Sequence, residues 1–122
     1  MGENTFSRDV RLLTPTHFGN VFQDATSAPS PQITLLARTN QLTNARLGIT
    51  IAKKRVKKAH DRNRIKRIIR ESFRHHQSGL GNIDIVVIGK SGLDSMTNQE
   101  IFNLLDKLWK KIFRRCNPSL SV

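Results

Sequence analysis

Basic side chains are concentrated in one stretch of the chain, from Lys53 to Arg74. This stretch holds eleven of the 21 lysine and arginine residues of the protein. Guanidinium groups form planar, two-pronged hydrogen bonds with phosphate oxygens, and ammonium groups add positive charge. The formal net charge of +12 over the whole chain also implies an anionic partner. The composition therefore favours nucleic acid as the partner and phosphate binding as the chemistry.

The apolar residues within this stretch recur with the period of a helix. They form an apolar stripe consisting of Ile65, Ile68, Ile69 and Phe73. At roughly 100° per residue, a basic flank runs along one side of this stripe. The basic flank consists of Asn63, Lys66, Arg67, Arg70 and Arg74. A helix with this pattern can bury the stripe and present the flank to phosphates.

Arg62 and Arg64 do not fall on the basic flank. Arg62 lies at roughly 60° from the centre of the apolar stripe, where an unpaired, fully buried guanidinium would be too costly. Either the helix begins close to Arg62, or the side chain reaches along the edge of a cleft toward a ligand. The cleft is the favoured interpretation. Arg64 shares a third side of the helix with Glu71, so its contact with the same ligand is less secure.

The remaining titratable residues predict no catalytic centre within the polypeptide. The nine acidic residues are scattered, and none form a pair spaced to hold metal ions for phosphodiester cleavage. The four histidines form no zinc pattern with the single cysteine, Cys116. His75 and His76 are interpreted as cations that close the basic helix at the negative end of its dipole. No glycine-rich phosphate loop of the GxxxxGK[ST] type is present.

Six elements are predicted along the chain. Thr14 and Pro15 begin a first helix that ends near residues 24–26, before a loop over residues 27–31. Strands are expected at 33–39, 46–52 and 83–88, and the basic helix lies between the second and third, ended by Gly79 and Gly81. The first two strands should pair as antiparallel neighbours, because only a short polar loop joins them. The third should be central and covered on both faces, because its apolar run hardly alternates.

The last helix is predicted from its ends and its apolar spacing. Thr97 and Glu100 form a capping box, with Met96 and Ile101 as a hydrophobic staple, and Asn117-Pro118 ends the helix. The order α-β-β-α-β-α indicates an α/β (α+β) two-layer sandwich with a small mixed sheet. A single domain, 1–122, fits this length, with flexible ends at 1–13 and 117–122. Neither a secretory signal nor a membrane-spanning run is expected, so a cytoplasmic protein without a membrane partner is predicted.

The residues that carry the basic pattern also carry a resemblance to a known family. The run Leu47–Lys54 (LGITIAKK), followed by Ala59 and by the sequence RNRIKR at 62–67 with Arg70-Glu71 and Phe73, closely resembles the protein subunit of bacterial ribonuclease P. The similarity runs from about residue 11 to residue 115 and includes FGNVF at 18–22. The resemblance implies a left-handed βαβ crossover, whereas the usual rule predicts a right-handed one.

The resemblance also implies a function. The family's protein assembles with a large catalytic RNA, and this ribonucleoprotein cuts the 5′ leader from precursor tRNA. The protein would be an accessory subunit of an endoribonuclease, with the catalytic groups and Mg²⁺ held mainly by the RNA. The RNA-binding residues implied here are Arg62, Asn63, Arg64, Lys66, Arg67, Arg70, Lys53 and Lys54. A central cleft that guides the single-stranded leader is implied to include Phe18 and Phe22, although their spacing alone favours a place in the core.

The chain departs from the family at one position of this cleft. Some members carry an aromatic residue near the position of Leu36, whereas this chain has leucine there and no tyrosine at all. This chain is therefore expected to differ in leader sequence preference from members that carry an aromatic residue there. Without the resemblance, a non-enzymatic RNA-binding protein such as a ribosomal protein would suit the same charge and fold. A helix-turn-helix DNA-binding protein is disfavoured, because a strand rather than a partner helix precedes the basic helix.

Overall fold

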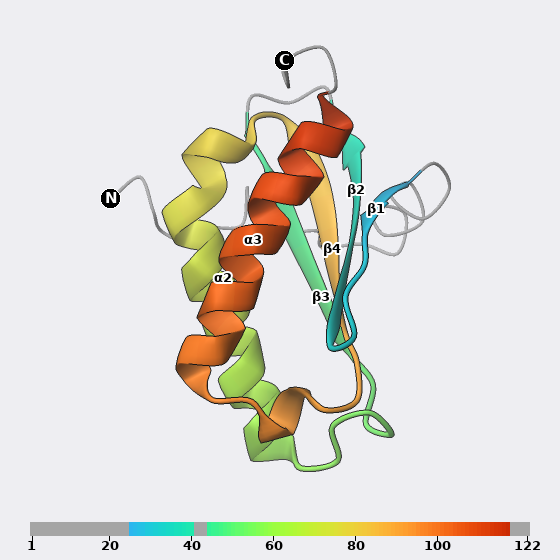
Figure 1. Ribbon diagram of the computed structural model, residues 1–122, viewed down its shortest axis with the longest axis vertical. Helices are drawn as coiled ribbons and strands as arrows, with labels where there is room; N and C mark the ends of the chain where they lie inside the picture. Colours follow the sequence, from blue (N-terminus) through green and yellow to red (C-terminus); the bar gives the residue numbers. More distant parts are fainter. Residues whose placement is uncertain (1–24, 41–43, 118–122) are drawn as a thin grey trace.

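The protein folds as a four-stranded mixed sheet with two long helices packed side by side on one face (Figure 1). The computed structural model describes residues 25–40 and 44–117. Its elements are β1 (Thr26–Ala28), β2 (Ile33–Thr39), β3 (Arg46–Ile51), α2 (Ala59–Leu80), β4 (Ile83–Gly89), the 3₁₀ helix η2 (Leu93–Ser95) and α3 (Asn98–Cys116). The expected two-layer sandwich is confirmed. Phe18, Phe22, the body of the predicted first helix and the end segments 1–13 and 118–122 lie outside the described residues.

The strand order is β1-β2-β4-β3, so the predicted pairing of the second and third strands with each other is wrong. β4 lies between them, antiparallel to β2 and parallel to β3. Ile85, Val86 and Val87 on β4 are all fully buried. The most apolar strand takes the interior position, because only there are both of its faces and both of its edges covered. The predicted central place of β4 is confirmed. The chain passes from β3 through α2 to the parallel strand β4, which makes a βαβ unit. The left-handed crossover of this unit stays a prediction.

Residues 26–28 form a strand where the end of the first helix and the start of a loop were predicted. β1 pairs antiparallel with the outer edge of β2, and Ala28 is completely buried. Arg115 of α3 also holds it, because its Nη1 donates a hydrogen bond to the carbonyl oxygen of Ser27 at 2.6 Å. Pro29 and Pro31 then end the strand, since proline cannot donate to a sheet. The sequence of β1 is only three residues long and is followed by prolines, so its pattern cannot be distinguished from that of a loop.

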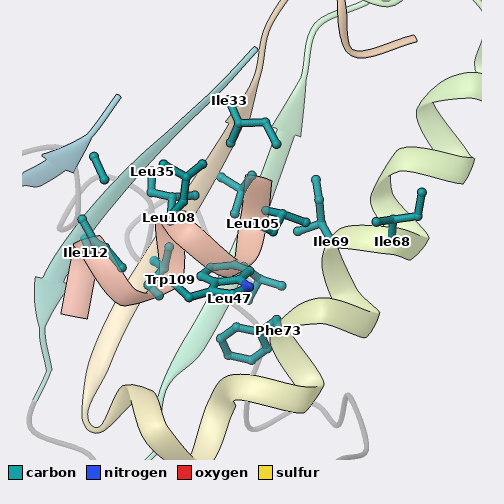
Figure 2. Close-up of a cluster of buried hydrophobic side chains, with 14 of the residues drawn as sticks. Ile33, Leu35, Leu47, Ile68, Ile69, Phe73, Leu105, Leu108, Trp109 and Ile112 are labelled. Carbon is teal, nitrogen blue, oxygen red and sulfur yellow. The ribbon is translucent and has the colours of Figure 1, made fainter. Parts of the chain in front are cut away.

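The core lies between the sheet and the two helices (Figure 2). All four residues of the apolar stripe on α2 are buried, and α3 buries Ile101, Leu105, Leu108, Trp109 and Ile112. The rings of Phe73 and Trp109 meet edge to face with their centroids 5.9 Å apart. The indole Nε1 of Trp109 donates a buried hydrogen bond to Ser72 Oγ at 2.8 Å. These contacts fix how α2 is rotated about its own axis, and so which side of it faces solvent.

Both ends of α3 match the prediction. Thr97 Oγ1 accepts from the backbone N–H of Glu100 at 3.1 Å, and the Glu100 carboxylate accepts from the N–H of Thr97 at 2.8 Å. Met96 and Ile101 pack against the same core, as a hydrophobic staple requires. The helix ends at Cys116, and the N–H of Asn117 donates back to the carbonyl oxygen of Phe113 at 3.1 Å.

The sheet face opposite the helices carries rows of residues in register across three strands. One row is Leu36, Val86 and Gly48; Val86 is fully buried, and the half-buried Leu36 packs against it. In the next row, Asp84 lies between Arg38 and Arg46. Arg46 donates to both carboxylate oxygens of Asp84, from Nε at 2.8 Å and from Nη2 at 2.6 Å. The hydrogen bond to Asp84 raises the pKa of Arg46, and this ion pair joins β3 to β4.

We predict opposite effects for alanine at two glycines. A Cβ on Gly89 would lie 2.8 Å from Cγ1 of Ile51 and 3.0 Å from Leu93 Cδ1, whereas a Cβ on Gly79 in α2 meets nothing within 4 Å. Gly89→Ala should lower the free energy of unfolding by about 1–3 kcal/mol through overpacking. Gly79→Ala should raise it by roughly 0.5–1 kcal/mol, because alanine loses less entropy in a helix.

Urea denaturation of both variants beside the wild type measures this difference. Equal stability for the two variants would contradict the close packing of β4 against Ile51 and Leu93.

Candidate nucleic-acid interface

The basic stretch divides into a loop and a helix. α2 begins only at Ala59, so Lys53 to Lys58 form the connection from β3, with Lys53 and Lys54 exposed and Val56 buried beneath them. At the other end, α2 runs through Gly79 to Leu80 and stops at Gly81, whose φ of 72° is a conformation that glycine adopts readily. Gly79 and Gly81 were both expected to end the helix, but only Gly81 does so.

The basic flank of α2 lies on the side that faces away from α3. Residues of α2 that contact η2 or α3 include Arg64, Ser72, Phe73 and His76. On the helical wheel Ser72 and His76 lie roughly opposite the basic flank, and Arg64 and Phe73 lie to either side of them. Within the flank, Asn63 and Arg67 are exposed, and Lys66, Arg70 and Arg74 are half-buried. The predicted geometry is confirmed here: a buried stripe on one side fixes a row of cations on another.

Three arginines of this flank surround a shallow surface pocket. Arg67, Arg70, Glu71 and Arg74 line a hollow of about 330 Å³, at the lower end of the sizes found for ligand pockets. Glu71 Oε1 lies 3.8 Å from Arg74 Nη2. Arg74 Nε is buried without a hydrogen-bond partner among the described residues. Guanidinium groups one helical turn apart around such a hollow can accept a phosphate group. Arg74 thereby joins the candidate site, although the resemblance did not imply it.

Arg62 does not reach along a cleft, so the interpretation favoured from the sequence is wrong. Its Nη1 donates to the carbonyl oxygens of Val56 at 2.9 Å and Lys57 at 2.8 Å. The helix begins three residues before Arg62, and the guanidinium folds back onto the loop that enters the helix. This arrangement avoids the cost of an unpaired buried charge. Arg62 therefore holds in place the loop that carries Lys53 and Lys54.

Arg64 points toward the other helix. Its Nη1 donates to Asn98 Oδ1 at 2.6 Å, and the guanidinium also approaches the carbonyl oxygens of Asp94 at 3.4 Å and Met96 at 3.5 Å. Arg64 therefore braces η2 and the first turn of α3 against α2, on the third side where the wheel placed it. Arg62 and Arg64, two of the implied RNA-binding arginines, thus donate hydrogen bonds within the protein. No local sequence pattern identifies their acceptors.

His76 of α2 contacts both its own helix and α3. His76 Nδ1 lies 2.9 Å from the carbonyl oxygen of Ser72, and its Nε2 lies 3.4 Å from Asp106 Oδ1 on α3. The interpretation that His75 and His76 close the helix is wrong, because α2 continues to Leu80.

Burial raises the pKa of the Cys116 thiol at the end of α3.

The described part of the chain has neither a cluster of metal-binding side chains nor a helix suited to a bilayer. Across residues 25–40 and 44–117, no three His, Cys, Asp or Glu side chains gather where they could share a metal ion. The helices of the same ranges include none that is both long and apolar enough to cross a bilayer.

We predict that replacing Arg62 with alanine destabilises the protein more than replacing Arg67 does. Arg62→Ala removes two hydrogen bonds from a charged donor and should lower the free energy of unfolding by about 1–3 kcal/mol. Arg67→Ala alters an exposed side chain and should change it by less than about 0.5 kcal/mol. Thermal denaturation gives both values, and amide exchange at residues 53–58 should quicken only in Arg62→Ala. Unchanged exchange in that variant would refute the role of Arg62 in ordering the loop.

Comparison with known proteins accounts for this combination of fold and basic helix. The family model described as Ribonuclease P matches residues 6–113. The ribonuclease P protein component of Pseudoalteromonas atlantica is 71% identical over 119 residues, which cover 98% of this chain and 99% of the relative. That of Histophilus somni is 56% identical over 114 residues, or 93% of this chain and 96% of the relative.

Solved structures agree. The RNase P protein of Staphylococcus aureus superposes with a TM-score of 0.79 at 33% identity, over 85% of this chain and 97% of the other. That of Thermotoga maritima gives a TM-score of 0.70 at 31% identity, over 82% and 96%. The fold, the basic helix and the sequence similarity along nearly the whole length lead to one conclusion: this chain belongs to the ribonuclease P protein family.

Proposed function

We propose that this protein is the accessory subunit of a cytoplasmic ribonuclease P, which assists a catalytic RNA in removing the 5′ leader from precursor tRNA. The observation that carries the proposal is the basic flank of α2, a row of cations held at the surface by the buried stripe behind it. Family membership favours this role over that of a ribosomal protein, which the charge alone would also suit.

The chemistry is assigned to the RNA. Mg²⁺ ions bound mainly by the RNA would activate the attacking water and stabilise the leaving oxygen. The protein would supply fixed positive charge where the backbones of catalytic RNA and precursor tRNA approach each other. Each phosphate that a lysine or arginine neutralises releases counterions and lowers the repulsion between the two RNAs. The complex would then need less Mg²⁺ to assemble.

The proposed roles of the site residues differ. Asn63, Lys66, Arg67 and Arg70 contact the catalytic RNA, and Arg74 joins them in the pocket. Lys53 and Lys54 extend this surface along the loop. Arg62 and Arg64 hold the loop and η2 in position and direct their remaining N–H groups to the RNA.

The leader is proposed to run over the sheet face opposite the helices. Phe18 and Phe22 are further contacts that the resemblance implies, and both lie outside the described residues. The half-buried Leu36 is the apolar side chain of the row Leu36, Val86 and Gly48 that a base could contact, because Val86 and Gly48 beside it are buried. A leucine offers a base apolar contact but no ring on which to stack. Tolerance of different leader bases at this point is the expected consequence.

We predict that the protein lowers the Mg²⁺ concentration needed by a bacterial ribonuclease P RNA to cleave precursor tRNA. Lys66→Gln, Arg67→Gln and Arg70→Gln combined should lose at least about tenfold of that stimulation, as expected when several phosphate contacts are removed. Raising Mg²⁺ should restore cleavage, because the missing charge is then supplied by the ion. Cleavage rates over a Mg²⁺ titration measure both effects.

Two failures have separate meanings. Folded wild-type protein that gives no stimulation at low Mg²⁺ would contradict the proposed function. Full stimulation by the triple variant would leave the function standing and contradict the placement of the site on α2.

A further inference from the structure

α3 carries a second concentration of positive charge, separate from the interface described above. The nine residues from Lys107 to Arg115 include five cations and no acidic residue. Four of them share one side of the helix at positions i, i+3, i+4 and i+7. This group, the basic flank of α3, consists of Lys107, Lys110, Lys111 and Arg114.

The charges of this flank are not neutralised within the described part of the protein. Lys107, Lys110 and Arg114 are exposed and Lys111 is half-buried. None of the four has a carboxylate of a described residue within 4.0 Å, whereas Arg115 beside them donates to Ser27. Like charges four residues apart destabilise a helix, and this flank holds two such pairs, Lys107 with Lys111 and Lys110 with Arg114. An anionic partner would convert this repulsion into binding.

The two basic flanks lie on opposite sides of the helix layer. α3 contacts α2 through Asp106 and Trp109, and its basic flank is centred roughly 150° around the helix from Trp109 and roughly 90° from Asp106. The bond from Arg115 to Ser27 turns the Arg115 side of α3, roughly 90° from the centre of the basic flank, toward β1. Figure 1 shows β1 and β2 on the side of α3 away from α2. The flank of α2 faces away from α3 in the other direction. One phosphate strand lying along α2 would therefore not reach the cations of α3.

A carboxylate lies between the two basic surfaces. Asp106 of α3 faces α2 at the seam between the helices, where its Oδ1 lies 3.4 Å from His76 Nε2. Glu71, by contrast, lines the pocket of the α2 flank beside Arg74. Negative charge at this seam disfavours continuous coverage by a single polyanion, because an RNA backbone crossing it would meet like charge. The charge pattern fits two separate strands better than one.

We propose that the basic flank of α3 binds a second segment of RNA backbone, so that the protein bridges two phosphate strands. The inference rests on the proposed function only for the identity of the RNAs, since phosphates of the catalytic RNA and of precursor tRNA share the same chemistry. The cations of the basic flank of α3 are spread over about 10 Å of helix, at about 1.5 Å per residue. Three of the four are lysines, which act as point charges, so the contact does not depend on base sequence.

The first test neutralises each flank with the same loss of charge. One variant combines Lys107→Gln, Lys110→Gln, Lys111→Gln and Arg114→Gln, and its matched control combines Lys66→Gln, Arg67→Gln, Arg70→Gln and Arg74→Gln. Glutamine keeps a helix propensity close to that of lysine and arginine, so both should stay folded, which circular dichroism checks. Affinity is measured for the catalytic RNA alone and for precursor tRNA binding to the assembled holoenzyme.

The α3 variant should weaken at least one of these two affinities about tenfold or more, and the affected RNA identifies the source of the second strand. Affinities within twofold of wild type for both RNAs would overturn the proposal. They would leave the proposed function intact, because that function is judged by wild-type stimulation of cleavage.

A second test asks whether the two flanks touch different RNA segments. Cysteine is placed at Lys110 or at Arg70 in a Cys116→Ser background and coupled to a photo-activated cross-linker. Cross-links from Lys110→Cys should map to nucleotides that do not overlap those from Arg70→Cys. Overlapping nucleotides, or no cross-link from Lys110→Cys while Arg70→Cys reacts, would overturn the proposal.

Discussion

The burial of the apolar stripe of α2 is the constraint on which the functional surface depends. Ile65, Ile69 and Phe73 are fully buried against the sheet and α3, and Trp109 meets both Phe73 and Ser72. These contacts leave the helix no freedom to turn about its axis. The cations of the basic flank are therefore held on one side of the molecule by the packing of the opposite side of the helix, and charge that would be mobile in a tail becomes a fixed surface.

The arginines of the basic stretch divide the work between structure and binding. Arg62 and Arg64 donate to carbonyl and amide oxygens of the loop, η2 and α3, so their side chains shape the surface. Arg67, Arg70 and Arg74 surround a pocket on the outer side of the same helix. An ordered loop and a fixed helix reduce the entropy lost on binding, which is one source of affinity that counting charges overlooks.

Sequence reasoning succeeded where a single element carries its own pattern. The stripe of α2, the capping box of α3 and the unbroken apolar run of β4 were all readable as local spacing. It failed where the outcome depends on distant partners. β4 displaces β3 from β2 because a strand buried on both faces needs the interior, and β1 exists only because the edge of β2 is there to receive it. Arg62 was misread because its acceptors belong to a loop whose path the spacing does not encode.

The central claim is that α2 binds RNA through fixed charge, and the salt dependence of binding tests it most directly. The affinity for the catalytic RNA is measured over a range of KCl concentrations, for the wild type and for a variant with Lys66, Arg67, Arg70 and Arg74 changed to glutamine. We expect a steep linear fall of log K with log salt, and a slope smaller by about three in the variant, since each phosphate contact contributes roughly 0.7–0.9. The same slope and the same affinity in both proteins would contradict it.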